Sequence, residues 1–251
     1  PYGDGDMTFY DEEKHGALLD DYLEHTKASG IKRFIYTNTH CLSLAKAAEN
    51  SDYWQLGKDG NPLYGYGIYK VACINPKGAF HKEIIKNIKG ICTHDVGGIF
   101  FDGPLMRDTG CYCKTCQADF MEKFGHSIFD ATDIERHKFR VDTVTEHIKI
   151  ASETIKSINP NIALYINNSA LRADITGSNT RELYDYVDLL GSEAGFYIPS
   201  CSCESLWKNS AFLKHLECII GDPLKEKKPM VNFVAANDSA ISEQDKTSAE
   251  T

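Results

Sequence analysis

The sequence predicts an α/β protein of the (β/α)8 TIM-barrel type, truncated at both ends. Short apolar strands alternate with helix-like segments, which is typical of parallel βαβ units. No Gly-x-Gly-x-x-Gly or Gly-x-x-x-x-Gly-Lys loop follows any predicted strand, so a nucleotide-binding doubly wound sheet has no support. A complete barrel needs eight strands, and the sequence predicts five, with a helix before the first. We therefore expect a fragment of a barrel.

The first predicted elements are a helix and a strand. The acidic run Asp11–Glu13 begins the helix, an apolar stripe follows it, and Gly30 ends it. A short apolar run over residues 33–37 predicts the first strand. The polar and aromatic segment from Asn38 to about Asn75 shows no clear period, so no element is assigned there.

The second strand is predicted over residues 96–102, after a helix whose apolar residues recur from Phe80 to Ile88 at helical spacing. A cysteine-rich loop comes next, and Phe120 and Phe124 indicate a short helix after it.

The third and fourth strands are predicted over residues 162–166 and 187–190, with a helix near 179–186 between them. A long helix over residues 133–157 precedes the third strand. Asn159-Pro160 ends that helix, because a residue before proline disfavours the helical region.

The last predicted elements are a helix near residues 204–219 and a fifth strand over 229–234. The chain then turns polar, which is typical of a loop or a frayed end. We therefore divide it into a partial barrel over 1–235 and a polar tail or loop over 236–251, leading to a missing C-terminal part.

The charge and composition of the chain argue against some classes of binding partner. The chain has 251 residues, 36 acidic against 27 basic, and a formal net charge of −9. That balance argues against nucleic acid, whose phosphates need clustered Lys and Arg. No apolar run is long enough to span a membrane.

The start of the sequence, Pro-Tyr-Gly-Asp-Gly, carries no targeting signal, although one could lie upstream. Use of the cysteines as free thiols or zinc ligands favours the cytoplasm. Homo-oligomerisation stays open.

Polar side chains follow every predicted strand. The carboxyl ends of barrel strands meet on one face, where barrel enzymes carry their active sites. Hydroxyl, amide and imidazole groups suit sugar hydroxyls, so we expect a carbohydrate substrate there. The predicted substrate-binding residues are Asn38, His40, Tyr165, Asn167, Asn168 and Asn232.

Two of these strand ends present a carboxylate, Asp102 and Glu193. Glycosidic bond cleavage uses such a pair, about 5–5.5 Å apart in retaining enzymes and about 6.5–9.5 Å apart in inverting ones. Each carboxylate also has a structural interpretation, because Asp102 precedes Gly-Pro and could form a turn, and Glu193 could pair with a basic neighbour. Their shared face favours the catalytic interpretation.

Nine cysteines occur, and three of them lie together as Cys111-Tyr-Cys113-Lys-Thr-Cys116. Zinc, disulfides and free thiols are all open, but Cys-x-Cys is a poor disulfide geometry, and the spacing suits a structural zinc site. We take Cys73 as the fourth ligand, since the chain returns to the same rim there. Cys41 and Cys92 are the weaker alternatives.

Several motifs resemble known families over about residues 30–235. Cys73-Ile-Asn75-Pro76, the Phe-Phe-Asp102-Gly strand end and the cysteine cluster together resemble bacterial barrel proteins labelled hypothetical glycosyl hydrolases. The Cys-x-Asn and Cys-Tyr-Cys-x-x-Cys elements are similar to the zinc site of family 42 β-galactosidases. The Phe-Phe-Asp-Gly strand end resembles the nucleophile strand of family 29 α-L-fucosidases.

The resemblance implies a retaining glycosidase barrel with a structural zinc, in which Asp102 is the nucleophile and Glu193 the acid/base. The β-galactosidase pattern departs from this chain, since that family has Asn-Glu at its fourth-strand end and Gly103-Pro104 occupy the place here. The alternatives are a non-catalytic carbohydrate-binding or scaffold barrel and, ranked last, a zinc-thiolate methyltransferase barrel.

Overall fold

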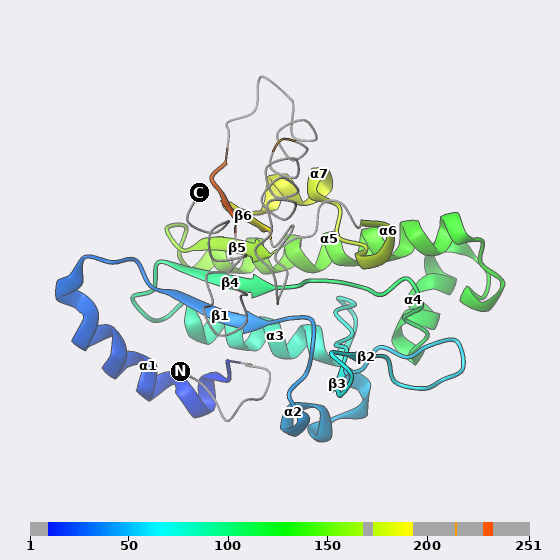
Figure 1. Cartoon of the computed structure of the whole chain (residues 1–251), viewed down its shortest axis with the longest axis horizontal. Helices are drawn as coiled ribbons and strands as arrows, with labels where there is room; N and C mark the ends of the chain where they lie inside the picture. Colours follow the sequence, from blue (N-terminus) through cyan, green and yellow to red (C-terminus); the bar gives the residue numbers. More distant parts are fainter. Residues whose placement is uncertain (1–9, 168–172, 193–213, 215–227, 233–251) are drawn as a thin grey trace, which may run out of the picture.

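The computed structural model describes residues 10–167, 173–192, 214 and 228–232, and Figure 1 shows the chain. Within these ranges, no helix is long and apolar enough to cross a membrane. Apart from Lys214, which is helical, the predicted helix near 204–219 lies outside the described residues, as does the tail over 236–251.

A five-stranded parallel sheet forms the centre of the protein. Its spatial order is the chain order, as expected for parallel strands joined by crossovers between sequential neighbours. All five predicted strands are confirmed. They are β1 (Phe34–Asn38), β4 (Gly98–Asp102), β5 (Ala163–Asn167), β6 (Leu189–Ser192) and β7 (Met230–Asn232).

The register of the sheet aligns the ends of three strands. Asn38 of β1 pairs with Asp102 of β4, and Asp102 pairs with Asn167 of β5. Because side chains alternate between the two faces of a strand, residues paired in this way present their side chains on the same face. Three polar side chains predicted from separate strand ends therefore lie in one row across the sheet.

Helices pack on the opposite face of the sheet. Residues of β4 and β5 that point to that face, such as Phe101, Leu164 and Ile166, are fully buried. α3 and α5 contact each other there (Figure 1). These helices and their neighbours are α1 (Glu12–Thr26), η1 (Lys27–Ser29), α3 (Ala79–Ile91), α5 (Asp133–Ile158), α7 (Thr180–Leu183) and η4 (Tyr184–Tyr186).

The ends of the predicted helices have local causes. Gly30 adopts φ +68°, a left-handed conformation that favours glycine and ends the first helical segment. α5 begins with a capping box, in which the Thr132 side chain and the Glu135 side chain each bond the other's backbone N–H. α5 ends at Ile158, directly before the Asn159-Pro160 pair.

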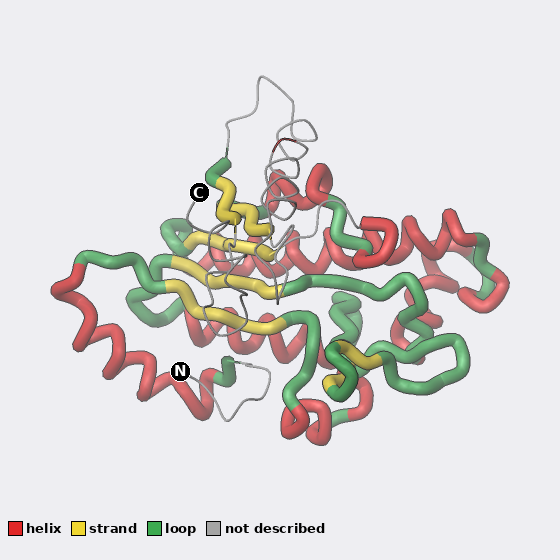
Figure 2. Tube along the Cα trace, viewed as in Figure 1, coloured by secondary structure: helices red, strands yellow, loops and turns green. Residues whose placement is uncertain are grey.

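The arrows of β1 and β4 point toward a group of small elements (Figure 1). Several of them lie in the segment 38–75, where the sequence showed no period, and Figure 2 shows β2 and β3 as two short strands among loops. They pair as an antiparallel hairpin. The elements at this end are α2 (Leu44–Glu49), η2 (Ser51–Tyr53), β2 (Tyr64–Gly65), β3 (Tyr69–Lys70), α4 (Lys114–Phe124), η3 (Ile128–Asp130) and α6 (Ala173–Thr176).

Candidate active site and metal centre

Asp102 is the last residue of β4, and neutral donors hold both of its carboxylate oxygens. Tyr36 Oη donates to Oδ2 at 2.6 Å, and Asn167 Nδ2 donates to Oδ1 at 2.8 Å. The two donors come from the neighbouring strands β1 and β5, which the register places on either side of Asp102. The arrangement fixes the plane of a half-buried carboxylate at the carboxyl end of the sheet.

Tyr36 is a site residue that the sequence prediction missed. Burial, the Asp102 charge and the hydrogen bond to Asp102 all raise the pKa of the Tyr36 phenol. The hydroxyl therefore stays protonated at neutral pH and keeps donating to the carboxylate. A signal for it exists in the sequence, because Tyr36 lies two residues before Asn38 and so shares its face.

Asn38 and Asn167, both predicted to bind substrate, have structural contacts here. Asn38 is buried, and its Oδ1 accepts from the backbone N–H groups of His40 and Cys41, both at 2.8 Å. Asn38 therefore orders the turn after β1, whereas the half-buried Asn167 orients Asp102. Sugar contacts of either residue stay a prediction.

His40 lies beside this row, packed against the backbone of Gly103. A Cβ at Gly103, whose φ is +62°, would come within 2.9 Å of His40 Cβ, so glycine suits both the turn and the close approach. Burial and the nearby Arg107 lower the pKa of His40 to about 4, although Asp102 acts in the opposite direction. The imidazole is neutral at neutral pH.

Tyr165 lies deeper in the sheet than the other predicted residues. Its ring stacks on Phe100 with centroids 4.2 Å apart and an interplanar angle of 15°. A Cβ at Gly191 would lie 2.4 Å from Tyr165 Oη, so the absence of a side chain on β6 makes room for this ring. Tyr165 thus belongs to an aromatic layer beneath Asp102.

Three predicted site residues are only partly placed or not placed. Glu193 and Asn168 lie outside the described residues. Asn232 is described as backbone only, and it pairs with Ser192, the residue before Glu193. The distance from Asp102 to Glu193 therefore stays open.

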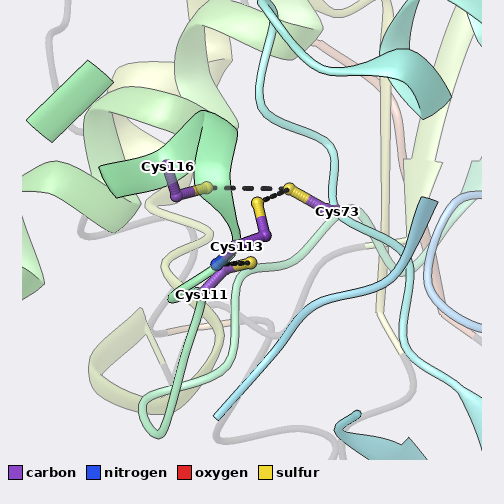
Figure 3. A group of neighbouring side chains, drawn as sticks. All are labelled: Cys73, Cys111, Cys113 and Cys116. Carbon is purple, nitrogen blue, oxygen red and sulfur yellow. Dashed lines mark hydrogen bonds between the residues drawn. The ribbon is translucent and has the colours of Figure 1, made fainter. Parts of the chain in front are cut away.

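The four predicted metal ligands come together. One sulfur from each of Cys73, Cys111, Cys113 and Cys116 lies within 4.8 Å of the others, and all four residues are buried (Figure 3). Neither alternative cysteine, Cys41 or Cys92, belongs to this group.

The sulfur spacing fits a tetrahedral metal ion. Cys73 Sγ lies 3.7 Å from Cys113 Sγ and 3.6 Å from Cys116 Sγ. Those distances are much longer than a disulfide bond of about 2.05 Å. Four sulfurs placed tetrahedrally at about 2.3 Å from an ion would be about 3.8 Å apart. The cluster therefore suits a metal and not a pair of disulfides.

Backbone and amide N–H groups point at the sulfurs, as is typical of thiolate ligands. Leu56 N donates to Cys111 Sγ at 3.4 Å, and Asn75 Nδ2 donates to Cys116 Sγ at 3.7 Å. Hydrogen bonds with its neighbouring thiols, together with burial, raise the pKa of Cys73. Hydrogen bonds from the neighbouring thiols lower the pKa of Cys113 instead. A cation among the sulfurs would stabilise the thiolate forms of Cys73 and Cys116, whose pKa values are raised.

Asn75 of the Cys-x-Asn motif connects the cluster to a buried carboxylate. Its amide also donates to Asp119 Oδ2 at 2.9 Å, and Asp119 on α4 is 1% exposed. Lys77 and Lys123 compensate that charge at 2.9 and 3.1 Å. The motif thus fastens the loop before α3 to α4.

Gln55, which the sequence did not single out, links the loops on the two sides of the site. Its side chain is fully buried, donates to the carbonyls of Ala72 and Leu105, and accepts from Arg107 N at 3.0 Å. A glutamine in a loop gives no recognisable pattern, so only the structure reveals this role.

No protein-family model matches the sequence, and no curated protein matches it. Solved structures do match. The β-galactosidase of Rahnella sp. R3 aligns with a TM-score of 0.64 and 13% identity, over 90% of this chain and 39% of that one. The β-galactosidase of the haloarchaeon Halorubrum lacusprofundi aligns with a TM-score of 0.57 and 17% identity, over 78% and 36%.

A third match is the β-galactosidase of Bacillus circulans sp. alkalophilus, with a TM-score of 0.57 and 14% identity, over 80% of this chain and 35% of that one. The chain therefore spans less than two fifths of the length of each enzyme. The expected likeness to β-galactosidases is confirmed at the level of fold alone: the chain has the fold of part of a (β/α)8 barrel.

Proposed function

We propose that this chain carries the two catalytic carboxylates of a retaining glycoside hydrolase, with Asp102 as the nucleophile and Glu193 as the acid/base. The observation that carries the proposal is the fixed carboxylate at the end of β4. Tyr36 and Asn167 occupy both oxygens with neutral donors, so no cation neutralises Asp102 through those bonds. The carboxylate is therefore oriented by neutral groups, with no salt bridge through those bonds competing with its attack.

The proposed reaction has two steps. Asp102 attacks the anomeric carbon while Glu193 protonates the departing glycosidic oxygen, giving a glycosyl ester on Asp102 and a free alcohol. Glu193 then takes a proton from water, which attacks the same carbon and releases the sugar and the Asp102 carboxylate. Tyr36 and Asn167 are positioning residues, since each touches the nucleophile.

The test is Asp102→Asn in the protein as it occurs naturally, assayed on a panel of aryl glycosides. An amide cannot serve as the leaving carboxylate, so we expect hydrolysis to fall by at least about 10³-fold. Asp95→Asn is the matched control, because Asp95 is an exposed aspartate just before β4 and should leave the rate unchanged.

Unchanged hydrolysis in the Asp102→Asn variant would eliminate Asp102 as the nucleophile. Sugar binding with no hydrolysis by the native protein would favour the non-catalytic carbohydrate-binding barrel instead. Anomeric configuration of the first-formed product, read by NMR, separates retention from inversion.

We further propose that the cysteine cluster holds a structural zinc ion. Four thiolates complete a tetrahedral shell and leave no position for water, so such an ion takes no part in hydrolysis. When bound, it would supply a fixed cross-link between the loop before α3 and the loop before α4.

A further inference from the structure

Arg107, five residues beyond β4, carries a guanidinium that no acceptor satisfies in the described part of the chain. Its backbone N–H donates to Gln55 Oε1, but its side chain, including the buried Nε, has no hydrogen-bond or ion-pair partner among the described residues. By contrast, the buried Arg140 donates to three backbone carbonyls. A half-buried, unpaired guanidinium is costly, and a ligand is one explanation for it.

The guanidinium lies beside the candidate active site. Arg107 Nη2 and His40 Nε2 each lie 3.5 Å from the position that a Cβ of residue 65 would occupy. Because residue 65 is glycine, no side chain fills that position. His40 Nε2 is also buried, with no partner in the described residues. Arg107 and Asp102 both influence the charge of the His40 ring, so both lie near it.

An aromatic side chain completes the group. Tyr66, at the turn of the β2–β3 hairpin, is 73% exposed, and its ring centroid lies 5.8 Å from that of His40. Its backbone has φ +48°, a left-handed conformation that is strained for a non-glycine residue. An exposed ring in a strained turn beside polar groups suits stacking against a sugar.

We infer that the sugar bound here carries an anionic group, a carboxylate or a sulfate ester, and that Arg107 binds it. This inference rests on the proposed function. The planar guanidinium matches two oxygens of such a group at once. The chain has a net charge of −9, which repels anions in general, so recognition of one requires a local cation. Asp102 does not use Arg107, because Tyr36 and Asn167 already hold its oxygens.

The test compares sugars that differ only in charge. Methyl galactoside and methyl glucoside are titrated into the native protein by calorimetry. The corresponding methyl uronic acids and methyl 6-sulfates are titrated in the same way and compared with the neutral parents. We expect one anionic form to bind about 10- to 100-fold more tightly than its neutral parent, as a charge-assisted pair supplies. Which anion is preferred distinguishes the carboxylate from the sulfate.

Arg107→Gln should lower the affinity for the anionic sugar to about that for its neutral parent. Arg181→Gln, at an exposed arginine of α7, is the matched control and should keep the preference. Added sodium chloride should weaken only the anionic ligands in the native protein, a readout that needs no variant.

Equal affinities for neutral and anionic sugars, without salt dependence, would overturn the inference. If neutral glycosides were still hydrolysed and the Asp102→Asn variant lost that activity, the proposed function would remain supported. Absence of both binding and hydrolysis for every sugar would overturn the two together.

Discussion

At the scale of single residues, the orientation of Asp102 depends on one hydroxyl and one amide. Tyr36 and Asn167 reach the carboxylate from opposite sides, at 2.6 and 2.8 Å. Hydrogen bonds to charged groups contribute about 1.5–3 kcal/mol each. Each donor should therefore have a measurable effect on catalysis without touching the sugar.

Tyr36→Phe removes the donor to Oδ2 and keeps the ring that packs 5.4 Å from Phe100. We expect kcat on aryl glycosides to fall about 10- to 100-fold, with KM nearly unchanged, because orientation of the nucleophile matters most in the transition state. Tyr22→Phe, at a half-exposed tyrosine of α1, is the control. A drop in thermal stability that accounts for the lost rate would contradict a positioning role.

The sequence predicts the hydrogen-bond acceptor at this site, Asp102, better than it predicts the two donors, Tyr36 and Asn167. Asp102 could be predicted because a carboxylate at the end of a short apolar run is conspicuous. Asn167 was expected to bind sugar, but its amide instead contacts a residue 65 positions earlier in the chain. Arg107 and Gln55 lie in loops, where no periodicity indicates which way a side chain points.

At the scale of elements, the long helix α5 depends on its first turn. Thr132 Oγ1 and the Glu135 carboxylate satisfy backbone N–H groups that would otherwise lack a partner. This is the helix that packs against α3 behind the sheet, so a frayed start would loosen that layer.

Thr132→Ala should lower the free energy of unfolding by about 1 kcal/mol, and the melting temperature by about 2–4 °C. The change in melting temperature is measured by thermal unfolding, with circular dichroism as the signal. Thr154→Ala is the control in the same helix, since Thr154 bonds only the carbonyl of Ile150 and alanine favours a helix interior. Equal losses in both variants would argue against the cap.

A histidine pair joins α3 to α5. His81 Nδ1 and His147 Nδ1 lie 2.7 Å apart, and both side chains are buried. Burial, aided by Lys82, lowers the pKa of His81 to about 4, and burial lowers the pKa of His147 as well. An unfolded histidine titrates near 6.5, so between pH 6.5 and 4 the unfolded chain binds more protons than the folded one.

Stability should therefore fall as the pH drops from 7 to 5, with His81 alone contributing about 2 kcal/mol of the loss. The measurement is urea unfolding at both pH values. Replacing the pair together, as His81→Leu with His147→Leu, should flatten this dependence without leaving an unpaired ring nitrogen. An unchanged slope would assign the pH dependence to other groups, such as His40.

The longer helices and the central strands could be predicted because each has a period or a boundary residue, whereas the short helices α2 and α6 were not predicted. Gly30 and Asn159-Pro160 mark two helix ends that the structure confirms. The hairpin over Tyr64–Lys70 could not be predicted, since its strands have two residues each and no alternation can be recognised. Its position is set by contacts with distant loops.

At the scale of the whole molecule, the cysteine cluster joins loops that follow two different strands. Cys73 lies between the hairpin and α3, whereas the other three ligands lie between β4 and the first turn of α4. Its four ligands could be predicted because three share one motif. The fourth follows from the rule that loops after parallel strands meet on one face.

Metal analysis should find about one zinc per chain, lost in Cys113→Ser. The melting temperature of that variant should fall by about 10 °C or more, since a structural zinc contributes several kcal/mol. Cys92→Ser, at a buried cysteine outside the cluster, should keep the zinc. Iron in place of zinc, or no metal at all, would contradict the proposal.

The position of this cluster along the chain has a consequence for synthesis. All four sulfurs precede β5, β6 and β7 in the sequence, so they leave the ribosome before those strands are made. An ion captured at that moment would hold the loop before α3 against the loop before α4 before β5 is made. β5 would then pair with β4 after those two loops are already cross-linked.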